Sequence, residues 1–445
     1  MRIGFGKVDI TPRIGVEMCG FGFYLNRQAI GVRDSLYARA MAVEQDGTTV
    51  VVVSNDLLGV EPPTTARVWE LVTAATGLPA AAVMVHCTHT HSGPATLPTV
   101  AAMGDPDAPY LEILPGRIAA ACIEAVQKLQ PATLSHTAVS CEGVGLNREY
   151  DNDAPPLEEC LRDDWRPAKP ELTDTTAHVL TAHADGKLLG FVSYFGCHPV
   201  VCCATTRYLH GDWCGVATGM LEREHPGAVG LFLQGAQGDV NSCVVHKAEK
   251  EAMLALDIIA SRYANQVRPG LAAGEPLAVD GVRCARHAKT FTRRQMPLEE
   301  VEAKLAEQEA ILHAPGASDE DGAVRGAMML AYGWRRVRDK VKAGLPLEPE
   351  TEVQGFRLGP VELLAGPFET FQAIKNDTVA GAKAPIPLVL AMTNDWRGYA
   401  TDHTTAERGG YAAEMVPLML GTTPFVEAHG ELVAAFLELD QELQR

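Results

Sequence analysis

The hydrophobic and polar positions of the chain repeat one order of elements three times. Two apolar runs enclose a tight turn, a stretch of helical spacing follows, and a short apolar run comes last. Asp46-Gly47 and Asp185-Gly186 form the first two turns, and Asp-Gly between apolar runs is a strong hairpin signal. The pattern therefore predicts three hairpin–helix–strand units. The expected hairpin, helix and strand cover 39–57, 63–76 and 81–85 in the first unit, 178–194, 213–224 and 229–233 in the second, and 355–364, 370–379 and 388–392 in the third.

The segment between the second and third units has a different composition. A charged amphipathic helix is expected over 298–308, Pro315-Gly316 breaks it, and a second helix is expected over 325–342. We interpret 298–344 as a helical hairpin inserted at the periphery. Further helices are predicted over 110–129 and 430–444. Because no long Pro/Ser linker separates these parts, we expect one domain over 1–445, of mixed α/β class with mixed sheets.

Composition and charge exclude several classes of function. The net charge of −18 argues against nucleic-acid binding and against an anionic membrane surface, since both require basic patches. Neither a signal peptide nor an apolar run long enough to span a membrane is evident. The 11 cysteines are an odd number and several lie in apolar runs, which favours free thiols over a disulfide framework. We therefore expect a cytoplasmic protein.

Polar residues follow the last two strands of every predicted unit. Ligand sites of α/β sheets lie outside the carboxyl ends of strands, so these six strand ends predict one composite site. The six groups are Ser54-Asn55-Asp56, His89-Thr90-His91, Cys197-His198-Pro199, Gln237-Gly238-Asp239, Phe368-Glu369 and Thr393-Asn394-Asp395.

The densest of these groups is the histidine cluster after the apolar run 81–85. If the strand continued, His89 and His91 would share a face, because alternate side chains of a strand point the same way. Histidine is the commonest metal ligand near neutral pH, and zinc accepts N, O and S donors. A polar loop with locally bonded histidines is the competing interpretation of this motif.

Two further residues complete a possible metal site. His198 stands at a strand end before Pro199, and Glu369 emerges from an apolar stretch in which a lone carboxylate would be costly. Two neutral imidazoles, a carboxylate and an open position describe a catalytic zinc site. In such a site the metal lowers the pKa of a bound water to about 7 and polarises a carbonyl group.

In these residues and their flanking motifs, the chain resembles the neutral ceramidase family, which consists of zinc amidases that hydrolyse the N-acyl bond of ceramides. The resemblance covers most of the sequence, and 88–94, Thr-His-Thr-His-Ser-Gly-Pro, is the most specific motif. The other matching segments are Val8-Asp9-Ile10-Thr11-Pro12, Leu146-Asn147-Arg148, Cys197-His198-Pro199, Gly211-Asp212-Trp213, Gln237-Gly238-Asp239-Val240 and Thr393-Asn394-Asp395-Trp396-Arg397-Gly398-Tyr399.

The resemblance implies a role for each site residue. One Zn²⁺ per chain would be held by two histidines, a glutamate and a tyrosine, which are His89, His198, Glu369 and Tyr399 in this sequence. It also implies a proton-transferring histidine beside the reacting centre, and an arginine and a second tyrosine that stabilise the oxyanion or orient the substrate. These correspond to His91, Arg148 and Tyr411.

Three departures from the family pattern limit this comparison. The zinc glutamate of the family lies in a Pro-Gly-Glu segment, whereas Glu369 follows Gly366-Pro367-Phe368, so its register is open by one residue. The serine expected after Gly-Asp-Val is Asn241 here. The immunoglobulin-like domain and the usual secretion signal of ceramidases are not expected in this chain. A cytoplasmic, acidic relative is poorly suited to membrane ceramide.

The sequence therefore predicts a zinc hydrolase of a small N-acyl substrate, with esterase or lactonase activity, or a non-catalytic metal-binding relative, as alternatives. We expect Asp212, Asp239 and Asn241 to support the ligands, with the two aspartates fixing ligand tautomers. A cysteine ligand, or a second metal near His210 and His403, remains a further alternative, as does a homo-oligomeric state.

Overall fold

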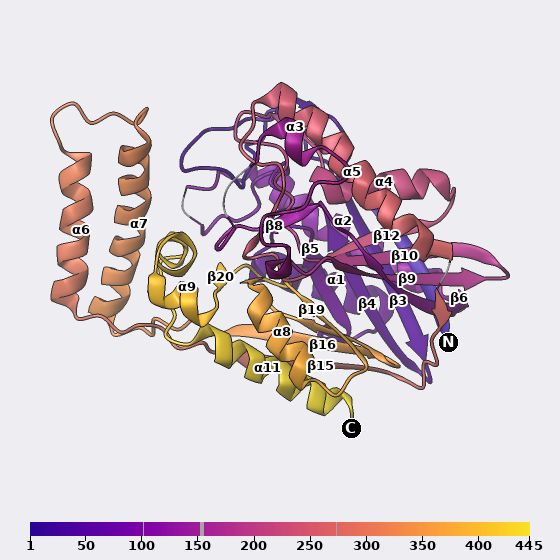
Figure 1. The fold of residues 1–445 in the computed structure, drawn as a ribbon. Helices are drawn as coiled ribbons and strands as arrows, with labels where there is room; N and C mark the ends of the chain where they lie inside the picture. The colour runs from indigo at the N-terminus through magenta and orange to yellow at the C-terminus, as the bar shows by residue number, and fades with distance from the viewer. Residues whose placement is uncertain (101, 152–154, 273) are drawn as a thin grey trace.

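The computed structural model describes residues 1–445 except 101, 152–154 and 273. Its mixed α/β architecture confirms the expected fold class, and all three predicted units are present (Figure 1). In each unit a hairpin leads through a helix to a strand that pairs parallel with the second hairpin strand. The units are β3 (Tyr37–Gln45), β4 (Thr48–Asn55), α1 (Pro62–Thr76) and β5 (Val83–Cys87); β9 (Thr176–Ala184), β10 (Lys187–Phe195), α4 (Asp212–Glu224) and β12 (Val229–Gln234); and β16 (Thr351–Leu358), β17 (Val361–Ala365), α8 (Gln372–Gly381) and β19 (Ile386–Leu390).

Each unit also has an additional strand before it and a long helix after it. The additional strands pair antiparallel with the first hairpin strand and are β1 (Arg2–Asp9), β7 (Thr133–Ser140) and β15 (Val282–Lys289). The later helices are α2 (Ala108–Gln127), α5 (Glu249–Ala272) and α11 (Ala428–Leu443). Pattern reasoning predicted α2 and α11. It missed β7 and β15 because polar residues interrupt them, and neither forms an apolar run.

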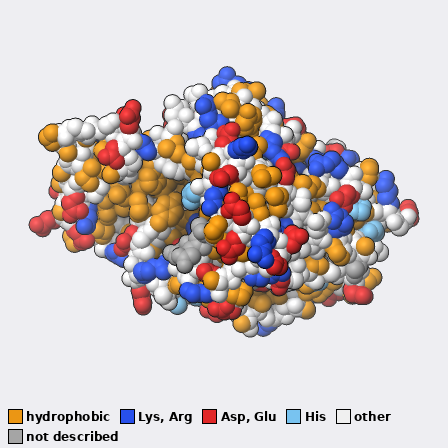
Figure 2. Space-filling view, turned by 45° about the horizontal axis from the view of Figure 1, so that its top comes forward, with side chains coloured by type: hydrophobic (Ala, Val, Ile, Leu, Met, Phe, Trp, Pro, Cys, Tyr) orange, Lys and Arg blue, Asp and Glu red, His pale blue; other side chains and the backbone are white. Residues whose placement is uncertain are grey.

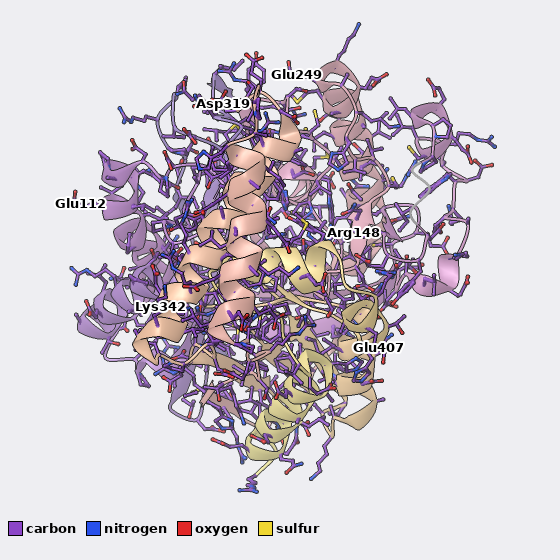
Figure 3. The ribbon with its side chains drawn as sticks, turned by 90° about the vertical axis from the view of Figure 1, so that its left-hand side faces the viewer. Glu112, Arg148, Glu249, Asp319, Lys342 and Glu407 are labelled. Atoms are coloured by element: carbon purple, nitrogen blue, oxygen red, sulfur yellow. The ribbon has the colours of Figure 1, made fainter. Side chains whose placement is uncertain are left out.

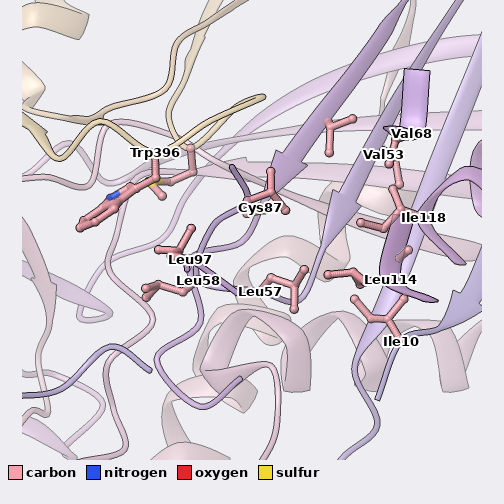
Figure 4. Close-up of a cluster of buried hydrophobic side chains, with 14 of the residues drawn as sticks. Ile10, Val53, Leu57, Leu58, Val68, Cys87, Leu97, Leu114, Ile118 and Trp396 are labelled. Carbon is pink, nitrogen blue, oxygen red and sulfur yellow. The ribbon is translucent and has the colours of Figure 1, made fainter. Parts of the chain in front are cut away.

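The three sheets share one inner core, and helices cover their outer faces. Ile3 and Met84 of the first sheet, Leu231 of the second and Phe356 and Leu390 of the third belong to one buried apolar cluster. Figure 4 shows the outer core of the first sheet, which α1 and α2 cover. Burial of both sheet faces explains why strands such as β4 are continuous apolar runs rather than alternating ones.

The carboxyl ends of the last strands meet where the three units adjoin. The N–H of Gln234, the last residue of β12, donates to Nε2 of His86 in β5 at 2.8 Å, and the Asn394 N–H after β19 donates to the Val85 carbonyl at 2.7 Å. Burial lowers the pKa of His86 to about 3, so its ring is a neutral acceptor. These bonds bring the polar strand ends together, as a composite site requires.

The expected helical hairpin is formed by α6 (Leu298–Leu312) and α7 (Gly322–Ala343). It stands beside the sheets at the left of Figure 1, and Figure 3 looks onto it with Asp319 at its tip and Lys342 near its base. Gly333 of α7 lies against the Leu418 backbone so closely that a Cβ would come within 2.2 Å of the Leu418 oxygen. Among the described helices, none combines the length and apolarity needed to cross a membrane.

The remaining elements are short. Three two-stranded pairs lie around the strand ends: β2 (Gly31–Val32) with β11 (Tyr208–Leu209), β8 (Gly145–Asn147) with β13 (Val240–Ser242), and β18 (Glu369–Thr370) with β20 (Tyr399–Ala400). The others are β6 (Gln130–Pro131), β14 (Glu275–Pro276), α3 (Leu157–Cys160), α9 (His403–Arg408), α10 (Val416–Met419), short helical turns at Ala80–Ala82 and Pro170–Leu172, and a π-helix at Tyr411–Met415.

Candidate metal centre

His89, His198 and Glu369 converge on one buried point. Oε2 of Glu369 lies 3.2 Å from Nε2 of His89 and 2.9 Å from Nε2 of His198. Each residue is at most 2% exposed. The three donors follow β5, β10 and β17, so each unit of the fold supplies one of them.

The tautomers of the two imidazoles explain why this point suits a cation. Nδ1 of His89 lies 2.9 Å from the Leu58 carbonyl oxygen, and Nδ1 of His198 lies 2.6 Å from that of Gln237. In a neutral ring Nδ1 must carry the proton to make this bond, so Nε2 presents a lone pair to the carboxylate. Burial lowers the pKa of His198 to about 4, which disfavours a proton between these acceptors. The donor set therefore fits a metal ion.

The carboxylate of Glu369 is held from its other side by a residue that sequence reasoning did not select. Nε1 of Trp396 donates to Oε1 of Glu369 at 2.9 Å. Trp396 lies in the 393–399 segment, so the motif contained the residue although its spacing gave no sign of this bond.

His91 lies beside the ligand group. Its Nε2 is 3.2 Å from Nε2 of His89, and the two rings are nearly perpendicular. The expected geometry of this segment was wrong, because β5 ends at Cys87 and His89 has a left-handed φ of 67°. A turn in the backbone, rather than strand alternation, brings the two rings together.

A loop near the N-terminus encloses His91. Arg27, which is 5% exposed, donates from Nη2 to the backbone oxygen of His91. The Phe21 ring lies edge-on to the imidazole at a centroid distance of 5.1 Å. A Cβ at Gly20 would lie 2.5 Å from the ring. None of these three residues was predicted, because they lie outside the motifs.

Three more of the expected site residues lie near His198 and Glu369. They are Tyr399, Arg148 and Tyr411. The Tyr399 ring is nearly parallel to that of His198 at 6.4 Å, and strand pairing sets Tyr399 opposite Glu369. Arg148 lies over the Tyr399 ring at 5.2 Å. The Tyr411 ring is 6.0 Å from that of Tyr399 and is 46% exposed, so it borders the solvent.

Asn241 and Asp239 fix the loops of the centre. Asn241 accepts from Nη1 of Arg148 at 3.3 Å. Asp239 accepts from the Asn147 side chain at 2.9 Å and from the Gln372 N–H at 2.8 Å. Asp239 therefore holds segments from two units together, and burial raises its pKa to about 6.

Like Asp239, Asp212 holds loops of the centre in place through hydrogen bonds. It accepts N–H groups of Val201, Cys202 and Trp213 at 3.2, 3.3 and 2.8 Å, and burial raises its pKa to about 6. We expected Asp212 and Asp239 to fix the ligand tautomers. Backbone carbonyl groups do so instead, and the aspartates hold the loops that supply the ligands.

A second group of potential donors, Cys202, His210 and Asp212, has ligand atoms within 4.8 Å of one another. Nδ1 of His210 already accepts the Asp212 N–H at 3.0 Å, and the Asp212 oxygens accept the N–H groups named above. These hydrogen bonds engage Nδ1 of His210 and both oxygens of Asp212, while the buried Nε2 of His210 has no hydrogen-bond partner among the described residues. His403 lies elsewhere, stacked on His429 at 4.4 Å, and all eleven cysteines are free thiols.

Comparisons with known proteins identify the family and the fold of the chain. The model of the family described as "Neutral/alkaline non-lysosomal ceramidase, N-terminal" matches residues 1–293. The crystal structure of neutral ceramidase from Pseudomonas aeruginosa superposes with a TM-score of 0.74 at 20% identity, covering 99% of this chain and 75% of that chain. A structure described as ceramidase complexed with C2 also gives 0.74, at 18% identity, covering 100% of this chain and 75% of that chain. The fold is therefore shared with these proteins.

Proposed function

Since the chain belongs to the neutral/alkaline non-lysosomal ceramidase family, we propose that it is a zinc-dependent hydrolase that cleaves the amide bond of a small N-acyl substrate. One observation carries the proposal: Nε2 of His89 and Nε2 of His198 lie 3.2 and 2.9 Å from the same carboxylate oxygen of Glu369. Two imidazoles and a carboxylate form a donor set typical of catalytic zinc, which keeps a position open for water or substrate.

In this proposal His89, His198, Glu369 and Tyr399 hold one Zn²⁺ per chain. Bound zinc supplies Lewis-acid chemistry, which makes water a nucleophile near neutral pH and polarises a carbonyl group. Tyr399 joins the set because its ring lies beside His198 and its strand lies beside Glu369.

The other residues move protons and stabilise charge. His91 takes the proton of the attacking water at Nε2 and returns it to the departing amine nitrogen. Water adds to the acyl carbon, the carbon–nitrogen bond breaks, and a carboxylic acid and an amine leave. Arg148 or Tyr411 stabilises the oxyanion or orients the substrate. Arg27, which donates to the His91 backbone oxygen, and Phe21, which packs against the imidazole, keep His91 in place.

We further propose that the substrate is not ceramide embedded in a membrane. A net charge of −18 opposes docking on an anionic lipid surface, and the proposed site needs only a small molecule with an N-acyl group.

The test is the release of amine from N-acyl compounds of varied acyl length by the zinc-loaded protein. We expect turnover that a chelator removes and zinc restores. His91→Ala should keep zinc and lose about 100- to 10,000-fold in kcat, as expected for loss of a general acid–base group. His403→Ala, away from the centre, should match the wild type. Hydrolysis of the matching esters alone would make the protein an esterase. Zinc binding without any turnover would favour a non-catalytic relative.

A further inference from the structure

Arg148 carries a charge that no carboxylate neutralises by contact among the described residues. Its Nη2 donates to the Gly238 carbonyl at 2.7 Å and its Nη1 to the Asn241 side-chain oxygen at 3.3 Å, and both acceptors are neutral. Glu149, the next residue along the chain, pairs with Arg408 instead. Arg148 is partly exposed.

This arrangement is unusual for so acidic a chain. Acidic residues outnumber lysine and arginine, 56 to 38, so a carboxylate partner is readily available to most cations. The Tyr399 hydroxyl and the Glu369 carboxylate both act on Arg148, and His89, His198 and Trp396 already engage Glu369. With a divalent cation at Glu369, the region around Arg148 would be positive overall.

His246 lies on the same side of the site. Its ring is 6.1 Å from that of Phe21, which in turn lies 5.1 Å from His91, so the three aromatic rings form a continuous wall. His246 is exposed, and its backbone has a left-handed φ of 55°. Partial desolvation of the ring and the charge of Arg148 lower the pKa of His246. At neutral pH the imidazole is therefore a neutral group that can donate one hydrogen bond.

The molecule also has an apolar hollow. Figure 2 shows hydrophobic side chains gathered in a hollow between the α6–α7 hairpin and the rest of the molecule. Tyr411 is largely exposed beside Tyr399. A substrate with an apolar part and one anionic group would suit such a site.

We infer that the substrate carries a carboxylate next to the scissile amide, as an N-acyl amino acid does. Arg148 binds this carboxylate, and His246 donates a second hydrogen bond to it from the wall. Guanidinium groups suit carboxylates because their N–H groups match the spacing of the two oxygens. Tyr411 is then left to stabilise the oxyanion. The inference rests on the proposed amidase activity and specifies its substrate class.

The test compares N-acetyl-L-phenylalanine with N-acetylphenethylamine, which share acyl group and ring and differ only in the carboxylate. The same pair with a dodecanoyl group repeats the comparison at longer acyl length. We expect the zinc-loaded wild type to prefer the carboxylate compound of a pair by at least tenfold in kcat/KM.

The variants locate the origin of this preference. His246→Ala should lower kcat/KM about tenfold for the carboxylate compound, mainly through KM, because a hydrogen bond to a charged group is lost. The neutral compound should lose less, so that the preference for the carboxylate compound falls. His246→Gln keeps an N–H donor and should restore most of the preference, and His183→Ala, on β9, is the matched control.

The outcomes distinguish the substrate class from the activity itself. Equal or better hydrolysis of the neutral compounds would overturn the carboxylate inference and leave the amidase proposal standing. If His246→Ala keeps the full preference for the carboxylate compound, His246 does not bind the carboxylate. If the zinc-loaded protein hydrolyses none of the four compounds and no other N-acyl compound, the proposed function fails, and this inference fails with it.

Discussion

Nε2 of His198 lies 2.9 Å from Oε2 of Glu369, while Nδ1 of the same ring lies 2.6 Å from the Gln237 carbonyl oxygen. The imidazole comes from the second unit of the fold and the carboxylate from the third, and His89 adds a donor from the first. The repeated architecture thus brings three acceptors to the point where the units meet. A cation at this point would remove the repulsion between them.

Trp396 should tune the affinity of this centre without being a ligand. Trp396→Phe keeps most of the buried ring but removes the hydrogen bond to Oε1 of Glu369. Loss of such an outer partner typically weakens metal binding about 10- to 100-fold, and we expect that range for zinc. Competition with a chromophoric chelator measures the affinity. An unchanged zinc affinity would mean that the bond does not orient the carboxylate.

Gly20 should be required for the position of His91. Its φ is 107°, and a Cβ there would lie 2.5 Å from the imidazole, so Gly20→Ala must displace the ring. Misplacing a catalytic group by about 1 Å can cost about 100-fold in rate, and we expect a loss of that order in kcat with zinc retained.

Gly15→Ala is the matched control for this prediction. Gly15 also has a left-handed φ, of 92°, but a Cβ added there would meet nothing within 4 Å. The backbone strain is therefore similar and the contact with His91 is absent. Equal losses of kcat in the two variants would attribute the effect to strain alone.

Arg39 should be important for stability rather than catalysis. It is 4% exposed and bridges Asp56 at 2.6 Å and Glu222 at 3.3 Å. Arg39→Met leaves buried Asp56 without its cationic partner, while Glu222 keeps Lys7 at 2.6 Å, and breaking such a buried pair typically costs about 3–5 kcal/mol in the free energy of unfolding. Arg2→Met breaks the exposed pair with Glu44 and should cost under about 1 kcal/mol. Denaturant titration measures both, and similar small losses would contradict the prediction.

His178 should make stability depend on pH. Burial, with the neighbouring His136, lowers its pKa to about 4, whereas the unfolded chain has the ordinary value of 6.5. As pH falls from 6.5 towards 4, the unfolded state takes up a proton that the folded state does not. Stability is then lost, by up to about 1.4 kcal/mol per pH unit. The difference in unfolding free energy between wild type and His178→Asn should therefore shrink over this range. A constant difference would refute the assignment.

Much of the fold could be predicted from the sequence because its signals are local. Asp46-Gly47 and Asp185-Gly186 mark hairpins through their turn chemistry, and the helical spacing of 298–308 and 325–342 marks the inserted hairpin. Strands such as β15 could not be predicted in this way. Their pairing depends on a neighbour distant in the sequence, and neither face of β15 is buried along its whole length.

The candidate site was predictable where polar residues follow apolar strands, as at His89, His198 and Glu369. Tyr399 and Arg148 entered through family resemblance, because an isolated tyrosine or arginine carries no spacing signal. The sequence did not predict site roles for Trp396, Phe21 and His246, because these roles depend on packing between segments far apart in the chain. The tautomers of His89 and His198 could not be predicted from the sequence either, because the backbone carbonyl groups of Leu58 and Gln237 set them.

The most direct test of the central claim is elemental analysis of the purified wild-type protein beside His89→Ala. We predict about one zinc per chain in the wild type and its loss in the variant, with the fold retained by circular dichroism. Two metals per wild-type chain would indicate that the Cys202–His210–Asp212 cluster also binds a metal. No metal in the wild type, with neither binding nor added stability when zinc is supplied, would contradict the proposed zinc centre.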